Sequence, residues 1–159
     1  MLQKKPNPWG CAVTAFAMAL DIPVQQLLED FGHDGGKVIF PHQPEPMCRR
    51  GFHSQELIWA AWKHGFACTP VELFPAIQST DKKKTHRLFL NEPNCWARFE
   101  DYIQSTRGVL EGAGSECQHA VYYQHGRIYD PDGYQYVYSR RACELRSFYG
   151  NRLWIFTKR

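Results

Sequence analysis

The chain opens with a stretch whose apolar residues leave no polar face. Residues 11–20 read CAVTAFAMAL, and a helix formed by them is apolar on every side. Such a helix has to be buried, and its alanines let neighbouring elements approach closely. Residues 1–10, with Pro6 and Pro8, predict an extended arm that leads into this helix. We therefore expect the rest of the fold to pack around residues 11–20.

Two further helices are predicted in the first half of the chain. Pro23 is suited to open one of them, which ends at Gly32 and carries an apolar stripe at Val24, Leu27, Leu28 and Phe31. Ser54 is suited to cap the other, which runs to His64. Residues 33–53 between them are rich in Gly, Pro, His and Gln, with residues 38–40 as a possible short strand. A loop of this length is expected to border a functional site.

The pattern changes from helical to strand-like along the second half of the chain. Residues 66–73 predict a strand interrupted near Pro70, residues 79–87 an exposed loop, and Asn94 the cap of a helix that contains Trp96, Phe99 and Ile103. Strands are expected at residues 109–110, 119–124, 127–130, 134–138 and 153–157, with a short helix within 139–149. Helices first and antiparallel strands afterwards predict an α+β fold, in which N-terminal helices pack on a C-terminal antiparallel sheet.

Composition and charge narrow the class of protein. A chain of 159 residues with 43% hydrophobic content fits one globular domain over residues 1–159. A net charge of +3, without a long basic run, does not indicate a nucleic-acid or membrane partner. We find neither a charged-then-apolar leader nor a bilayer-spanning apolar run, so we expect a cytoplasmic protein. The six cysteines lack CxxC pairing and are expected to be free thiols in a reducing compartment.

A predicted hairpin brings a histidine and a carboxylate to one face of the sheet. If His125-Gly126 is a two-residue turn, Gln124 lies opposite Arg127 and Tyr122 opposite Tyr129. His119 and Asp130 are then diagonal neighbours on the same face, within reach of one another. With the register shifted by one residue, Asp132 would take the place of Asp130. A carboxylate that orients a histidine is half of a catalytic triad.

Cys11 is the best candidate for the nucleophile that such a pair would serve. It stands at the start of a helix, where the positive end of the helix dipole favours the thiolate. Cys117 lies two residues before His119 and is the nearest rival, but it does not open a helix. The remaining cysteines are expected to be structural or surface thiols, at Cys48, Cys68, Cys95 and Cys143.

These motifs occur in the order found in a known enzyme family. Gly10-Cys11 at the start of an alanine-rich helix, then His119-Ala120-Val121 and Tyr129-Asp130-Pro131, resemble the papain-like cysteine peptidases. The resemblance is closest to the compact branch that includes the double-glycine leader peptidases of bacteriocin exporters, and it extends over residues 3–136. Residues 51–57 (GFHSQEL) also resemble the second helix of small bacterial and phage-type members.

The resemblance implies a papain-like fold and a specific set of site residues. Cys11 would be the nucleophile, His119 the base and Asp130 the orienting acid, without a metal or other cofactor. Family members also place a glutamine before the cysteine, whose amide helps to bind the oxyanion. Gln3 is the glutamine upstream here, while Asn7 lies nearer to Cys11 and could donate the same bond.

The implied activity is that of a cysteine peptidase-like hydrolase. It would cleave a peptide or isopeptide bond in a protein or peptide substrate through a thioester intermediate. The same residues could instead serve a deamidase or transglutaminase, or the fold could be a catalytically silent binding module. The tyrosines of residues 122–138 fit a half-buried sheet, and an interaction surface is their alternative role. A zinc site is a separate alternative, with loosely spaced candidate ligands at His33, His42, Cys48 and His53.

Overall fold

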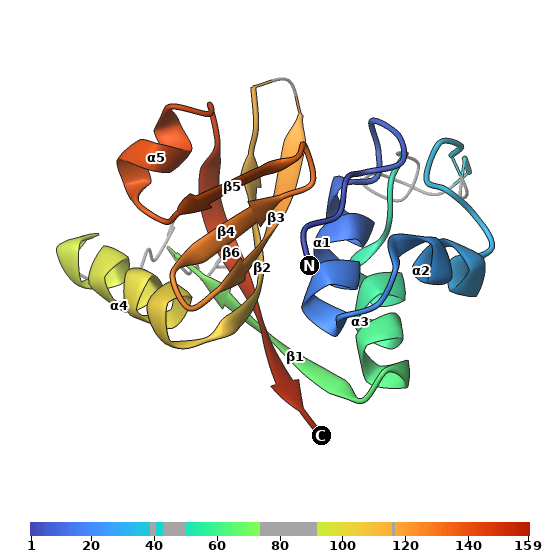
Figure 1. Cartoon of the computed structure of the whole chain (residues 1–159), viewed down its shortest axis with the longest axis horizontal. Helices are drawn as coiled ribbons and strands as arrows, with labels where there is room; N and C mark the ends of the chain where they lie inside the picture. The colour runs from blue at the N-terminus through green and yellow to red at the C-terminus, as the bar shows by residue number, and fades with distance from the viewer. Residues whose placement is uncertain (39–40, 43–49, 74–91, 116) are drawn as a thin grey trace, which may run out of the picture.

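Helices and strands alternate with loops in a computed structural model of the chain (Figure 1), which describes residues 1–38, 41–42, 50–73, 92–115 and 117–159. The helices are α1 (Cys11–Leu20), α2 (Val24–Phe31), α3 (Ser54–Lys63), α4 (Glu92–Ser105) and α5 (Arg140–Glu144). The strands are β1 (Phe66–Glu72), β2 (Arg107–Ala113), β3 (Gln118–Gln124), β4 (Arg127–Asp130), β5 (Tyr134–Val137) and β6 (Tyr149–Lys158). The predicted strand at 38–40 falls partly, and the loop at 79–87 entirely, outside the described residues.

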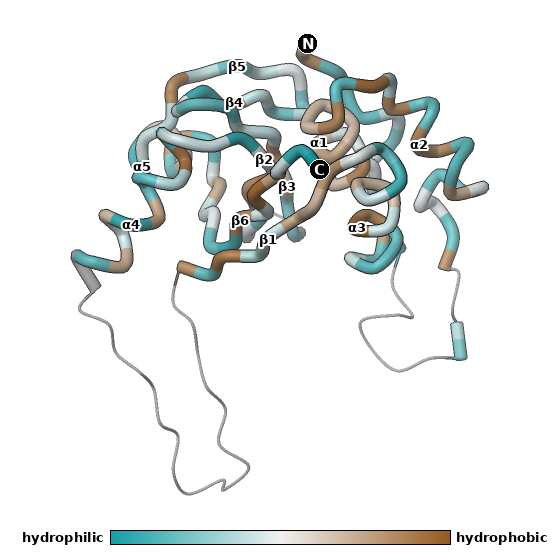
Figure 2. Tube along the Cα trace, turned by 90° about the horizontal axis from the view of Figure 1, so that it is seen from below, coloured by the Kyte–Doolittle hydropathy of each residue, from teal (hydrophilic) through white to brown (hydrophobic). Residues whose placement is uncertain are grey.

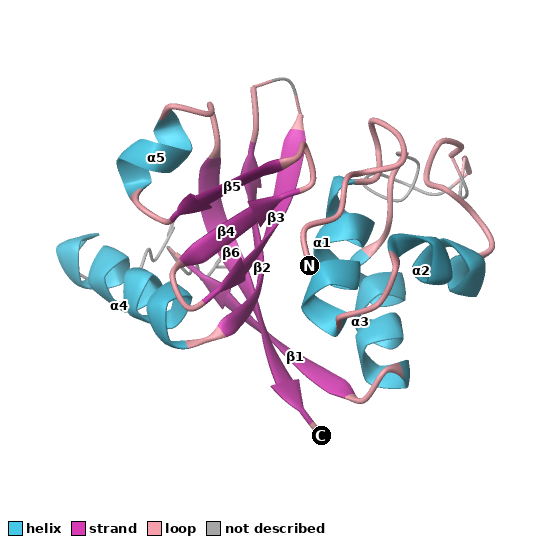
Figure 3. Ribbon diagram, in the orientation of Figure 1, coloured by secondary structure: helices cyan, strands magenta, loops and turns pink. Residues whose placement is uncertain are grey.

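The strands form one antiparallel sheet with helices on both faces (Figure 3). The six strands lie in the order β1-β6-β2-β3-β4-β5, and each pairs antiparallel with its neighbours. Helices α1, α2 and α3 come first in the chain and gather on one side of the sheet (Figure 1). The prediction of an α+β fold with N-terminal helices and a mainly C-terminal antiparallel sheet is thus confirmed.

Each face of the sheet contributes to its own apolar core, which explains why β3 is hydrophobic without alternation. Ala120 and Tyr122 belong to the core shared with α1, α2 and α3, whereas Val121 and Tyr123 belong to the core shared with α4 and α5. A strand buried on both faces reads as a continuous apolar run. Figure 2 shows the hydrophobic stretches of α1 and of the central strands gathered in the interior.

Helix α1 is the most deeply buried helix and lies between the sheet and the other N-terminal helices. Its residues from Val13 to Leu20 are all buried. The Phe16 ring meets Phe156 edge-on at 5.2 Å between centroids and lies 6.5 Å from Trp154. At the far end of the helix, Arg107 Nη2 donates to the carbonyl of Ala19. The prediction that residues 11–20 form a buried helix is confirmed.

Among the described residues, no single helix has the length and apolar character needed to cross a membrane. Helices α1 and α2 would meet that requirement together, but they are bent by 114° at their junction.

Two helices begin at other residues than the sequence predicts. In α3 the N-cap is His53 rather than Ser54, and Glu56 Oε2 accepts a hydrogen bond from the His53 backbone N–H at 2.9 Å. This contact is the carboxylate half of a capping box, in which the N-cap side chain is that of His53 and not the predicted Ser54 hydroxyl. Helix α4 begins at Glu92, so Asn94 is helical instead of capping.

Strand β1 continues through Pro70, where the sequence predicted an interruption. Pro70 lies opposite Trp154 in an unbroken register with β6. Because β1 is an edge strand, the N–H that proline lacks would have faced away from the sheet. Strand β6 is also longer than the predicted 153–157, and α5 is a single short helix capped by the Ser139 hydroxyl.

The hairpin that carries the candidate chemistry has the predicted register. Gln124 pairs with Arg127, Tyr123 with Ile128 and Tyr122 with Tyr129. His125 and Gly126 both have positive φ, at 45° and 76°, as a two-residue type I′ turn requires. The register therefore leaves Asp130, rather than Asp132, at the end of β4 beside β3.

Candidate active site

Cys11 stands at the first turn of α1, next to the start of β3. Its Sγ lies 4.0 Å from the carbonyl oxygen of Gln118. The first N–H groups of the helix have no intrahelical acceptor, and they give this end a partial positive charge. Gly10 at the N-cap brings no capping side chain, so these N–H groups are not covered by one. A thiolate or an oxyanion at Cys11 would be stabilised here.

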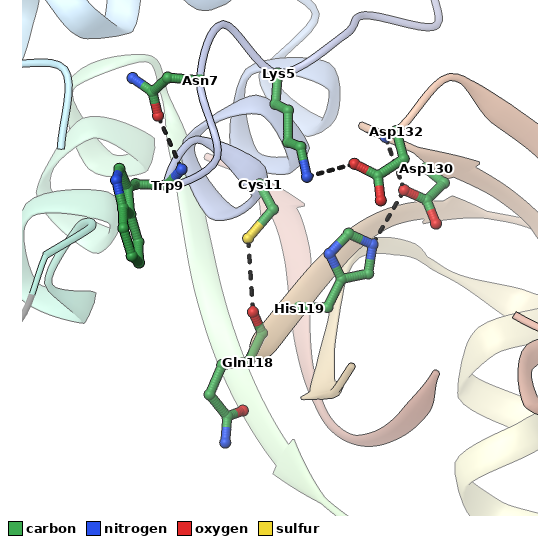
Figure 4. A network of polar contacts seen from close by, with 8 residues as sticks. All are labelled: Lys5, Asn7, Trp9, Cys11, Gln118, His119, Asp130 and Asp132. Atoms are coloured by element: carbon green, nitrogen blue, oxygen red, sulfur yellow. Dashed lines mark hydrogen bonds and ion pairs between the residues drawn. The ribbon is translucent and has the colours of Figure 1, made fainter. Parts of the chain in front are cut away.

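His119 lies between Cys11 and Asp130 (Figure 4). Its Nε2 is 3.0 Å from Asp130 Oδ1, and its other ring nitrogen, Nδ1, is turned toward the side of Cys11. Phe148 meets the imidazole edge-on at 5.4 Å between centroids. The backbone N–H of Asp132 donates to the same Asp130 oxygen at 2.9 Å. The imidazole is thus held by a carboxylate on one side and faces the thiol on the other.

Burial and charge act in opposite directions on the protonation of His119. Burial alone lowers the pKa of His119, since it penalises the charged imidazolium. The hydrogen bond and charge of Asp130, together with the interaction with Cys11, outweigh burial and raise the pKa to about 9. Asp130 itself is only 4% exposed, so its attraction acts through a poorly solvated environment. The site therefore favours an imidazolium next to the thiol at neutral pH.

The three residues predicted as a triad are thus brought together from distant parts of the chain. Cys11 comes from the buried helix, His119 from β3 and Asp130 from the end of β4. A nucleophile, a base in contact with it and an acid that orients the base are the arrangement that nucleophilic acyl transfer requires.

A cavity of about 450 Å³ opens beside Cys11 and His119. It is lined by residues that include Phe52 and Ser54 on the side of α3 and Glu111, Ala120 and Arg152 on the sheet. Burial raises the pKa of the Glu111 carboxyl, against the opposing charge of Arg152. Arg152 also donates to Glu72 Oε1, at 2.7 Å through Nη2. The cavity is large enough for a side chain of a peptide substrate, and its lining includes polar and charged side chains.

Gln3, which the sequence placed in the oxyanion hole, lies at the other end of α1. Its Nε2 donates to the Ile22 carbonyl at 2.7 Å, and its Oε1 accepts from the Val24 N–H at 2.7 Å. Both groups belong to the connection between α1 and α2, ten helical residues away from Cys11. The structure therefore does not bring Gln3 to the nucleophile. Its amide caps α2 instead.

Asn7, the alternative amide, is also engaged elsewhere. Its Nδ2 donates to the Asp34 carbonyl at 2.8 Å, and its Oδ1 accepts from the Trp9 N–H at 2.9 Å. Figure 4 shows its amino group pointing away from Cys11. Neither amide that the sequence offered donates into the site.

A residue that the sequence analysis did not single out reaches the surroundings of Cys11. Lys5 Nζ lies 2.5 Å from Asp132 Oδ1, and the side chain ends on the side of Cys11, with which it interacts electrostatically (Figure 4). The feature of the sequence that could have indicated this position is that Lys5 lies in the arm shortly before the helix. It is a weak signal, because a lysine in such an arm is more often exposed to solvent.

The other described cysteines have surroundings that do not resemble those of Cys11. Burial raises the pKa of Cys68 to about 11 and also raises that of Cys143. Cys95 belongs to α4 and is buried in the core between this helix and the sheet. Cys117, the predicted rival, is exposed in the loop between β2 and β3. Cys48 lies outside the described residues.

In the alternative zinc site, the candidate ligand His33 already makes hydrogen bonds with both ring nitrogens. His33 Nε2 is 2.9 Å from Glu56 Oε1, and His33 Nδ1 accepts from the Gly35 N–H at 3.1 Å. A different set could approach one ion among the described residues, since ligand atoms of His119, Asp130 and Asp132 lie within 4.8 Å of one another. In that set, His119 and Asp130 are partners of each other and Asp132 is paired with Lys5.

We expect Gln3→Ala to lower stability without slowing chemistry at Cys11. The change leaves the Ile22 carbonyl and the Val24 N–H without their partner, which costs about 1–3 kcal/mol of unfolding free energy. Urea denaturation measures this cost, and acylation of Cys11 by p-nitrophenyl acetate, which passes through an oxyanion, should keep the wild-type rate. Gln25→Ala, in the exposed face of α2, is the matched control and should change stability little. Slower acylation with unchanged stability would return Gln3 to the site.

The raised pKa of His119 predicts that stability depends on pH. The folded chain holds this proton more tightly than the unfolded chain, whose histidine has a pKa near 6.5. The stabilising contribution is complete below that value and is lost as the pH rises to about 9, a difference on the order of 3 kcal/mol.

Two measurements check this dependence. The unfolding free energy of the wild type should fall between these pH values, and Asp130→Asn should flatten the fall. NMR titration of the His119 ring in the wild type should give a pKa well above 6.5. A ring that titrates at or below its ordinary pKa would show that Asp130 does not hold the imidazolium.

Comparison with known proteins does not identify a family for this chain. No family model matches the chain, and no curated protein matches it. The indications of function come from the geometry of Cys11, His119 and Asp130 and from the cavity beside them.

Proposed function

We propose that the protein is a papain-like cysteine hydrolase that cleaves a peptide or isopeptide bond through a thioester intermediate. The observation that carries this proposal is one imidazole that faces a helix-start thiol and is held by a buried carboxylate at 3.0 Å. The resemblance of the motifs around Cys11, His119 and Asp130 to the papain-like peptidases supports the same activity.

The acylation half of the reaction follows from this arrangement. Sγ of the Cys11 thiolate attacks the carbonyl carbon, and the electron pair of the C=O bond moves onto oxygen. The oxyanion collapses, the C–N bond breaks, and the leaving amine takes the proton from the His119 imidazolium. Asp130 keeps the ring oriented throughout and stabilises its charged form.

Hydrolysis of the thioester returns the enzyme to its starting state. Neutral His119 accepts a proton from water as the water oxygen attacks the thioester carbonyl. The C–S bond breaks, the acid product leaves, and the thiolate–imidazolium pair is restored. The step requires no metal or redox group, because each proton moves between His119, water and the leaving group.

The cavity favours a peptide or protein as the substrate. It lies directly beside Cys11, where a side chain next to the scissile bond would enter. The five described cysteines that are free thiols fit work in a reducing compartment such as the cytoplasm.

Incubation with a panel of peptide, isopeptide and glutamine-containing substrates tests the reaction. Wild-type protein should release a new amine from at least one of them, and Cys11→Ala should release none, because the thioester cannot form. Intact-mass measurement should detect the acylated protein in the wild type. Ammonia release without chain cleavage would indicate a deamidase, and equal products with Cys11→Ala would contradict the proposal.

Alkylation by iodoacetamide tests the nucleophile independently of the substrate. Cys11 should be labelled much faster than Cys117, which is more exposed and serves as a control within the same chain. His119→Ala should slow the labelling of Cys11 and leave that of Cys117 unchanged. If Cys11 reacts no faster than Cys117 and is insensitive to His119→Ala, the triad is wrong.

A further inference from the structure

The proposed reaction needs a stabilising group that the predicted residues do not supply. Attack by Cys11 places a negative charge on the substrate oxygen, next to the first turn of α1. The Cys11 backbone N–H is one donor for that oxygen, since it has no acceptor within the helix. The amides of Gln3 and Asn7 make their hydrogen bonds elsewhere. A second donor has to come from another residue.

Lys5 is held at this place by the arm that leads into α1. Its backbone N–H donates to the Pro131 carbonyl at 3.0 Å, and its Nζ lies 2.5 Å from Asp132 Oδ1. The arm is therefore attached to the turn that follows Asp130. Figure 4 shows the side chain descending beside the first turn of α1, so that Nζ ends between Cys11 and Asp132.

The ammonium of Lys5 interacts electrostatically with Cys11 and Asp130. Burial tends to lower the pKa of Lys5, but the hydrogen bond and charge of Asp132, with further contributions from Cys11 and Asp130, raise it above its usual value. The side chain thus remains an ammonium. An ammonium has three N–H donors, and within the described part of the chain its side-chain contact is with Asp132, which leaves donors for a ligand.

We propose that Lys5 is a catalytic residue whose ammonium, together with the Cys11 backbone N–H, stabilises the oxyanion formed at Cys11. The assignment rests on the proposed function, because it concerns the oxyanion of that acyl transfer. Asp132 is a positioning residue in this arrangement. It holds the ammonium beside the site without consuming all of its donors.

A purely structural role for Lys5 makes a different prediction. If the lysine only clamped the arm to the turn of residues 130–133, its loss would disturb Asp130 and thereby His119. Every reaction of the Cys11 thiolate would then slow by the same factor. An oxyanion donor, in contrast, affects only reactions in which a carbonyl oxygen gains charge.

Two probes separate these roles. p-Nitrophenyl acetate transfers its acetyl group to Cys11: the S–C bond forms through an oxyanion, the C–O bond to the leaving group breaks, and p-nitrophenolate departs. Iodoacetamide reacts with the same thiolate by displacing iodide, so that no oxyanion forms. The ratio of the two rates therefore reports on the oxyanion alone, whatever the natural substrate.

The experiment compares the burst of p-nitrophenolate and the alkylation of Cys11 in the wild type, Lys5→Met, Lys5→Arg and Asp132→Asn. Lys5→Met should slow the burst by about 10²-fold, the loss typical of one oxyanion-hole donor, while alkylation stays close to wild type. Lys5→Arg should keep most of the burst, since it keeps the charge and the donors. Asp132→Asn should reduce the burst less than Lys5→Met does, because the ammonium is still present but is no longer held by a carboxylate.

Lys4→Met is the matched control, since it removes the same charge from the neighbouring residue. It should leave both rates unchanged. Equal losses of burst and alkylation in Lys5→Met, or no loss of either, would overturn the assignment. So would a loss in Asp132→Asn equal to that in Lys5→Met. A wild type without a Cys11-dependent burst would refute the acyl transfer itself, and that result appears before any lysine variant is made.

Discussion

The candidate site depends on the burial of a helix that has no polar face. Because α1 is apolar all round, it can only be stable between the sheet and the other N-terminal helices. The contacts of Phe16 with Phe156 and Trp154 fix its position on the sheet, and Arg107 holds its far end at Ala19. With its middle and its far end fixed, the helix places its N-terminus beside β3 near Gln118. The placement of Cys11 is thus a consequence of core packing, which is stiffer than a loop.

The N-terminal arm adds a second constraint by joining the helical layer to the turn after β4. Gln3 anchors the arm at the junction of α1 and α2, and Lys5 anchors it at Pro131 and Asp132. These attachments decide which polar side chain reaches the nucleophile. They turn the amide of Gln3 to the far end of the helix and bring the ammonium of Lys5 to the near end. A short extended segment therefore determines the local electrostatics of the site.

Charges around Cys11 are arranged in pairs that suit a reaction in which charge moves. His119 is paired with Asp130, and Lys5 with Asp132. Buried charges are costly unless they are paired and hydrogen-bonded, which applies to His119 and Asp130. Lys5 and Asp132 are more exposed, with side chains at 30% and 40%, so water also solvates that pair. The lining of the cavity next to them includes the Glu111 carboxyl, whose pKa is raised by its poor solvation. The surroundings of the thiol are consequently polar on one side and sealed by the core on the other.

The sequence by itself determined the elements whose signal is local or periodic. The apolar run of residues 11–20, the hairpin turn at His125-Gly126 and the register that sets Asp130 beside His119 all follow from spacing and turn chemistry. Local patterns failed where a distant partner decided the outcome. Pro70 is tolerated because β1 lies at the edge of the sheet, where β6 is its neighbour. Only the tertiary structure could decide between Gln3, Asn7 and Lys5 at Cys11, because the path of an extended arm is set by the surfaces against which it packs, and no periodic pattern records that path.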